Sequence, residues 1–167
     1  MQMSTEKDGL ETGAITQFAT AYNSKAGAGE LQFIELRSPP EPDGYCLLDG
    51  QPLYIEVGHI YGTQSDVKRL LGRTGKSAPS ARQQLLSAMV PLDHRLLVPL
   101  NNLLLDKATK TYAAAQVWLL IRSAFLLWDC SDFEQHLEDI VVPKNHPFEQ
   151  IWLLCGQTSV AGAIRLV

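Results

Sequence analysis

The sequence predicts an α/β domain, a mixed sheet flanked by helices. Three observations lead to this class: a helical repeat at residues 10–25, a hairpin pattern at 45–62, and an apolar strand at 115–124 behind a second helical repeat. Helices and strands that alternate in this way pack as layers around one core. The 167 residues are most simply a single domain, 1–167, in which the polar residues 1–9 are expected to be disordered.

The first predicted elements are a helix and a short strand. Ile15, Phe18 and Tyr22 recur at steps of three and four residues, which places them on one face of a helix. The glycines of "AGAGE" then favour a turn, and "LQFIEL" at 31–36 is a candidate strand. The prolines of "RSPPEPDG" lack backbone donors, so this segment is expected to stay outside the sheet.

A hairpin is predicted for "YCLLDGQPLYIEVGHIYG". Its turn contains Asp49 and Gly50, and Pro52 is expected to make the loop longer than two residues. The following residues, 64–89, predict a short helix, a Gly/Ser/Pro loop and another helix. A longer helix is predicted at 92–112, with Pro99 near the start of its main body.

The C-terminal third predicts three strands and a helix. The continuous apolar run "AQVWLLIRSA" is typical of a strand covered on both faces. "SDFEQHLEDIV" begins with a Ser/Asp capping signal and predicts a short helix. "FEQIWLLCG" and "SVAGAIRLV" predict two further strands, arranged as a closing hairpin.

Composition indicates a soluble chain with its own core. Hydrophobic residues make up 46% of the sequence, enough to fold without a covalent staple, and the longest apolar run, "VWLLI", is far too short to cross a membrane. The N-terminus lacks the pattern of a signal peptide. Cys46, Cys130 and Cys155 each lie beside apolar residues, which predicts buried free thiols and a reducing, cytoplasmic setting.

Charge is distributed unevenly along the chain. The net charge of -4 argues against a protein that coats nucleic acid through bulk charge. Residues 66–110 nevertheless carry eight Lys or Arg against three Asp, a local +5, which leaves -9 on the remainder. This segment is either a footprint for an anionic ligand or a solvated helical face. On the first interpretation, the phosphate-contacting residues would be Lys68, Arg69, Arg73, Lys76 and Arg82.

Two carboxylates are candidates for a metal site. Strand side chains alternate in direction, so Glu56 shares a face with Gly58, and the glycine is expected to leave space beside the carboxylate. Asp43 precedes the partner strand, and hairpin pairing would bring both acids to one end of the sheet. A pair of carboxylates suits magnesium, with manganese as a substitute.

Charged residues also occur on the apolar faces of the two long helices. Glu11 falls on the stripe of the first helix, which directs it to the core or to the edge of a site. Lys107 lies within the leucine stripe of the second helix, and Lys110 lies at its edge. Each lysine either extends its amine to solvent or serves a site.

At these residues the sequence resembles the PD-(D/E)xK nuclease superfamily, which has the restriction-endonuclease-like fold. "PPEPDG" followed by "YCLLDGQPLYIEVGH" is similar to uncharacterised members that read "PPDF", a glycine turn and "IEVT". "DKATKTYAAAQVWLLI" and "HPFEQIWLLCG" resemble the later helix–strand element and closing strand of those members. The resemblance covers residues 10–160 and is tightest at 39–60 and 104–154.

The resemblance implies a core of helix, three strands, helix and strand, and a magnesium-dependent nuclease acting on DNA rather than RNA. Asp43 and Glu56 match the metal-binding acids, with the carbonyl of Val57 as a further ligand, and Glu11 corresponds to an acid that some members carry on the first helix. The family's lysine is expected at position 58, where this chain has Gly58. Lys107 is the predicted substitute, with Lys110 second.

Several alternatives stay open at this point. His59 would serve as the missing base only if a bulge at Gly58 turned it towards Glu56. The protein could instead be a catalytically degenerate module that binds nucleic acid or protein, and fold resemblance alone does not establish activity. The apolar C-terminus "AGAIRLV" could pair with a partner as an edge strand, and a homodimer is also open. No membrane partner is expected.

Overall fold

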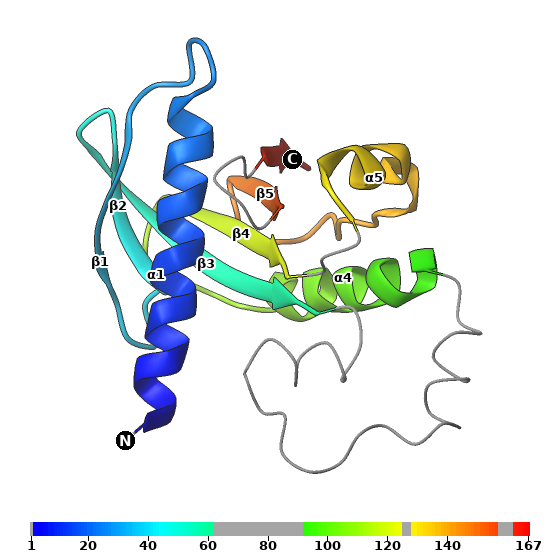
Figure 1. The fold of residues 1–167 in the computed structure, drawn as a ribbon. Coiled ribbons are helices and arrows are strands. Elements are labelled where there is room, and N and C mark those ends of the chain that lie inside the picture. The colour runs from blue at the N-terminus through cyan, green and yellow to red at the C-terminus, as the bar shows by residue number, and fades with distance from the viewer. Residues whose placement is uncertain (1, 62–91, 125–127, 157–161) are drawn as a thin grey trace.

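The computed structural model describes residues 2–61, 92–124, 128–156 and 162–167. In these residues a six-stranded mixed sheet has helices on both faces (Figure 1), which confirms the predicted fold class at this level. The strands lie in chain order: β1 (Leu31–Leu36), β2 (Gly44–Leu48), β3 (Gln51–Ile60), β4 (Val117–Ser123), β5 (Gln150–Cys155) and β6 (Gly162–Arg165). The helices are α1 (Gln2–Asn23), α4 (Leu92–Ala108), α5 (Cys130–Gln135) and the short 3₁₀ helix η1 (Leu137–Asp139).

The middle of the sheet is parallel and its two edges are antiparallel. β1, β2 and β3 pair antiparallel, β3, β4 and β5 pair parallel, and β6 returns antiparallel to β5. β4 is therefore paired on both sides, and its residues from Val117 to Ile121 are all buried, as expected for an apolar run covered on both faces.

The β2–β3 hairpin has a tighter turn than the sequence predicted. Leu48 pairs with Gln51, so the loop consists only of Asp49 and Gly50, and both have positive φ, 50° and 77°. Positive φ at both central residues is typical of a two-residue hairpin turn. The prediction that Pro52 lengthens the loop is wrong. The pairing of β3 with β4 begins only at Tyr54, so no partner strand requires a backbone N–H from Pro52.

The two faces of the sheet carry separate cores. α1 covers one face, where Phe18, Tyr22, Trp118 and Trp152 form an aromatic cluster with ring centroids 5.4–6.5 Å apart. α4 and α5 contribute to the core of the other face, and α5 does so through Phe133. This division places residues from α1 and from α4 on opposite sides of β3.

Helix boundaries differ from those predicted. α1 begins at Gln2, so the expectation that residues 1–9 are disordered is wrong for residues 2–9. α4 ends at Ala108 with Pro99 inside it, and α5 is capped by Asp129, two residues before the predicted Ser131-Asp132 signal. The helices and loop expected at 64–89 lie outside the described residues.

Within the described ranges, no helix is long and apolar enough to span a membrane.

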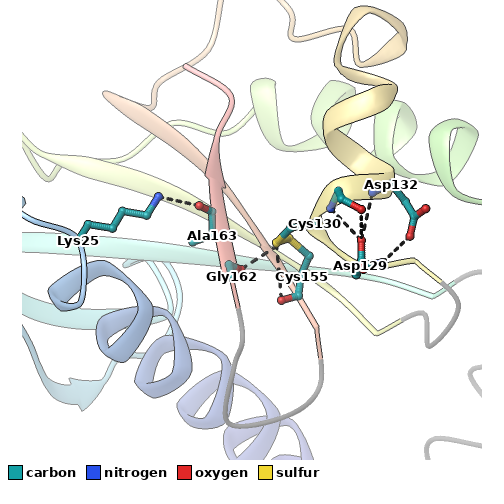
Figure 2. The surroundings of a disulfide bond; sticks show 8 residues. Lys25, Asp129, Cys130, Asp132, Cys155, Gly162 and Ala163 are labelled. Carbon is teal, nitrogen blue, oxygen red and sulfur yellow. Dashed lines mark hydrogen bonds between the residues drawn. A yellow bond between two sulfur atoms is a disulfide. The ribbon is translucent and has the colours of Figure 1, made fainter.

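Two of the three cysteines are joined, which corrects the prediction of three free thiols. Cys130 at the start of α5 and Cys155 at the end of β5 form a disulfide with a Cα–Cα distance of 5.3 Å (Figure 2). Gly162 of β6 packs beside it, and a Cβ there would lie 2.6 Å from Cys130 Sγ. Cys46 is free and buried in the core. The pairing was missed because a separation of 25 residues carries no spacing signal.

Candidate functional site

β3 extends beyond β2, and this difference in length positions Asp43. The ladder between the two strands ends where Gly44 pairs with Ile55, whereas β3 continues to Ile60. The next free donor on β3 is the amide of Val57, and Asp43 Oδ2 accepts its hydrogen bond at 2.9 Å. Because this bond is buried, the Asp43 carboxylate is fixed against the strand.

Glu56 is paired with Lys107 of α4. The Nζ atom of Lys107 donates to Glu56 Oε1 at 2.6 Å and to the carbonyl oxygen of Val57 at 3.0 Å. The lysine and glutamate side chains are only 14% and 10% exposed. Glu56 thus points to the α4 face of the sheet, and the structure brings the proposed substitute lysine directly to it.

Gly58 explains how α4 comes so close. A Cβ at this position would lie 2.8 Å from Cδ2 of Leu103. The expectation that Gly58 leaves space beside Glu56 is therefore wrong, because the leucine fills it. Lys107 follows Leu103 by four residues, one helical turn, so the same packing that excludes a side chain at 58 delivers the amine to Glu56.

Glu11 reaches the same region from α1, together with a lysine that the sequence analysis missed. Lys7 Nζ lies 3.0 Å from Glu11 Oε1 and 3.7 Å from Asp43 Oδ1. Burial raises the pKa of Glu11, the hydrogen bond from Lys7 lowers it, and the charge of Asp43 raises it again. Lys7 was missed because residues 1–9 were expected to be disordered, although its four-residue spacing from Glu11 is the signal of a helical ion pair.

These side chains line one pocket of about 710 Å³, which also includes Lys110 and Tyr112. Lys110 is exposed and lies just beyond the end of α4. Tyr112 packs against Phe148 with ring centroids 6.0 Å apart, and its hydroxyl is buried without a hydrogen-bond partner in the described part of the chain. Burial raises the pKa of Tyr112, and the nearby charge of Glu56 raises it further.

His59 lines the pocket but does not turn towards Glu56. The pairing of β3 with β4 runs without a shift from Tyr54 to Ile60, so the bulge considered at Gly58 is absent from this strand. Burial, and then the charge of Arg122, lower the pKa of His59 to about 4. The imidazole is therefore neutral near pH 7.

The five basic residues predicted to contact phosphates lie outside the described part of the chain: Lys68, Arg69, Arg73, Lys76 and Arg82. The structure accordingly brings together Asp43, Glu56, Val57 and Lys107, with Glu11, Lys110 and His59 around the same pocket.

The pocket offers oxygen atoms of the kind that a hard divalent cation binds. Asp43 and Glu56 supply carboxylate oxygens, and Val57 supplies a carbonyl oxygen on the same short segment. Magnesium is commonly held by one or two carboxylates together with water and substrate phosphate. Across the described ranges, no three His, Cys, Asp or Glu side chains form a metal-binding group, so the protein would offer at most a small part of the coordination shell.

Comparison of the chain with protein-family models, curated proteins and solved structures finds no match.

Proposed function

We propose that the protein is a metal-dependent nuclease of the restriction-endonuclease-like fold, which hydrolyses phosphodiester bonds in DNA. The observation that carries the proposal is the convergence of Asp43 and Lys107 on Val57, next to Glu56. Asp43 accepts the N–H of Val57, while Lys107 bridges its carbonyl oxygen and Glu56. An aspartate, a glutamate and a lysine at one strand end are the groups that the sequence resemblance implies.

The order of elements supports the same proposal. The described part of the chain runs α1, β1, β2, β3, α4, β4, in agreement with the helix, three strands, helix and strand that the resemblance implies. The acids lie at the hairpin β2–β3 and the lysine lies on α4, so each group comes from the element expected for it. The preference for DNA over RNA comes from the resemblance alone.

Each side chain would have a distinct role. Asp43, Glu56 and the carbonyl of Val57 would hold the magnesium ion, which when bound would activate a water molecule and stabilise charge on a phosphoryl oxygen. Lys107 now donates to Glu56 Oε1 and to the carbonyl oxygen of Val57, and it would have to leave these oxygens when the ion is bound. Its freed donors would then orient the attacking water or stabilise the charge that develops on the phosphate.

Cleavage of plasmid DNA in magnesium tests the proposal. Glu56→Ala should reduce the cleavage rate at least about 100-fold, since it removes a ligand and the partner of Lys107. Circular dichroism should show that the variant is folded. Glu134→Ala is the matched control, because Glu134 is an exposed acid that does not line the pocket. A Glu56→Ala protein that cleaves at the wild-type rate would remove the proposal.

A second candidate is a catalytically degenerate module that binds nucleic acid or protein. It is favoured by the ion pair itself, because the Lys107 ammonium already occupies Glu56 Oε1 and the carbonyl of Val57. If the amine stayed there, these two oxygens would be poor metal ligands. Wild-type protein that binds duplex DNA but cleaves it in neither magnesium nor manganese would favour this candidate.

A further inference from the structure

Lys7 and Lys107 are both paired with acids of the pocket, but they differ in exposure. The side chain of Lys7 is 63% exposed, whereas that of Lys107 is 14% exposed. Lys7 lies on α1 and Lys107 on α4, so they approach the carboxylates from the two opposite faces of the sheet. One ammonium is enclosed and the other is open to an incoming molecule.

The pocket is acidic, and this creates a problem for an anionic substrate. Its lining includes five carboxylates, those of Glu6, Glu11, Glu41, Asp43 and Glu56. The lysines that line it are Lys7, Lys107 and Lys110. A phosphodiester would be repelled by the acids unless a cation contacted it at the point of entry.

Lys7 has donors left for such a contact. An ammonium group has three N–H donors. Lys7 uses one at 3.0 Å on Glu11, while its 3.7 Å distance to Asp43 is too long for a hydrogen bond. By contrast, Lys107 already donates to two oxygens inside the pocket.

The pairing with Glu11 also gives the exposed lysine a defined place. Glu11 is buried on the core-facing side of α1. Its carboxylate therefore holds the Lys7 side chain beside Asp43. The exposed amine is therefore held at the pocket.

We propose that Lys7 is a substrate-binding residue, whose ammonium contacts a backbone phosphate of the nucleic acid while remaining paired with Glu11. The proposal rests on the nuclease function above and names a contact that the sequence did not predict. An exposed ammonium fits a phosphate as a point charge, without reading the base sequence.

Binding of a short fluorescein-labelled DNA duplex, measured by fluorescence anisotropy in calcium at several salt concentrations, tests this role. Lys7→Ala should weaken binding about threefold to tenfold and lower the salt slope by about 0.9, the contribution of one phosphate contact. Lys7→Arg should restore both quantities. Lys144→Ala is the matched control, because Lys144 is exposed and does not line the pocket.

The outcomes separate the two proposals. If Lys7→Ala is folded and binds DNA with wild-type affinity and salt slope, Lys7 is only a partner of Glu11 and this inference is overturned. An equal effect in Lys144→Ala would overturn it as well, because the loss would then reflect general charge. If the wild-type protein does not bind DNA at low salt, both the inference and the proposed DNA substrate fail.

Discussion

The ammonium of Lys107 lies 2.6 Å from Glu56 Oε1, although the two residues are 51 positions apart in the sequence. Gly58 and Leu103 lie next to this pair and set the distance between β3 and α4. The pair is therefore a consequence of helix packing on the sheet, and both its stability and its chemistry depend on that packing.

Removal of Lys107 should destabilise the protein strongly. Lys107→Met would leave the buried Glu56 without its cation, and an uncompensated charge of this kind costs about 3–5 kcal/mol. The double variant Lys107→Met/Glu56→Gln should recover part of the loss, because no charge is then left unpaired. Urea unfolding measures the three free energies. Lys110→Met, at an exposed position, should change stability by less than about 0.5 kcal/mol. Purely additive effects of the two site substitutions would contradict the coupling.

A side chain at position 58 should disturb the contact between β3 and α4. Gly58→Ala places a methyl group against Leu103, and we expect a loss of about 1–3 kcal/mol from overpacking. Leu103→Ala in the same chain should return part of that loss, since it removes the atoms that the new methyl group meets. Thermal unfolding of the two single variants and the double variant tests this. Equal melting temperatures for Gly58→Ala and wild type would show that Leu103 can move aside freely.

The disulfide should stabilise the folded chain. Cys130 and Cys155 close a segment with a separation of 25 residues, for which the chain-entropy argument gives about 3.5 kcal/mol. Unfolding by urea with and without dithiothreitol measures the difference. The variant Cys130→Ala/Cys155→Ala is the control and should unfold identically under both conditions. Three reactive thiols in unreduced, unfolded wild-type protein would show that the bond does not form.

Cys46 should be unreactive in the native state. Burial raises the pKa of its thiol to about 12, and only the thiolate reacts readily with Ellman's reagent. Since the folded-state pKa lies above the ordinary value of 9.0, the contribution of this group to stability is complete below pH 9 and declines as the pH rises towards 12. The stability difference between wild type and Cys46→Ala should therefore shrink above pH 9, as measured by urea unfolding. A difference that stays constant from pH 8 to pH 10.5 would contradict this.

Most of the sheet could be predicted from local patterns. The run from Val117 to Ser123 is continuous and apolar, and it became the doubly covered central strand β4. The Asp49-Gly50 turn located the hairpin, but its length depended on whether Pro52 faced a partner strand. The answer depends on where β4 begins to pair with β3, and the local sequence around Pro52 does not specify this.

The site was predictable where a residue's own face in an element was enough to place it. Glu56 and Glu11 followed from periodicity, and Lys107 followed from its place in a leucine stripe. Lys7 did not, because residues 1–9 were expected to be disordered and its second partner, Asp43, lies in the segment before β2. The neighbour of Gly58 was also hidden, since the identity of the residue facing it depends on how α4 docks.

The short β2 strand has a consequence for how this molecule could change. Two additional residue pairs in that hairpin would bring the carbonyl of Pro42 to the Val57 amide and release the carboxylate of Asp43 from its anchor. The core on either face would be untouched by such an extension. Extending the pairing of β2 with β3 would thus displace the Asp43 carboxylate without changing the fold. Chains with the same fold would then differ in whether they keep this arrangement of acids.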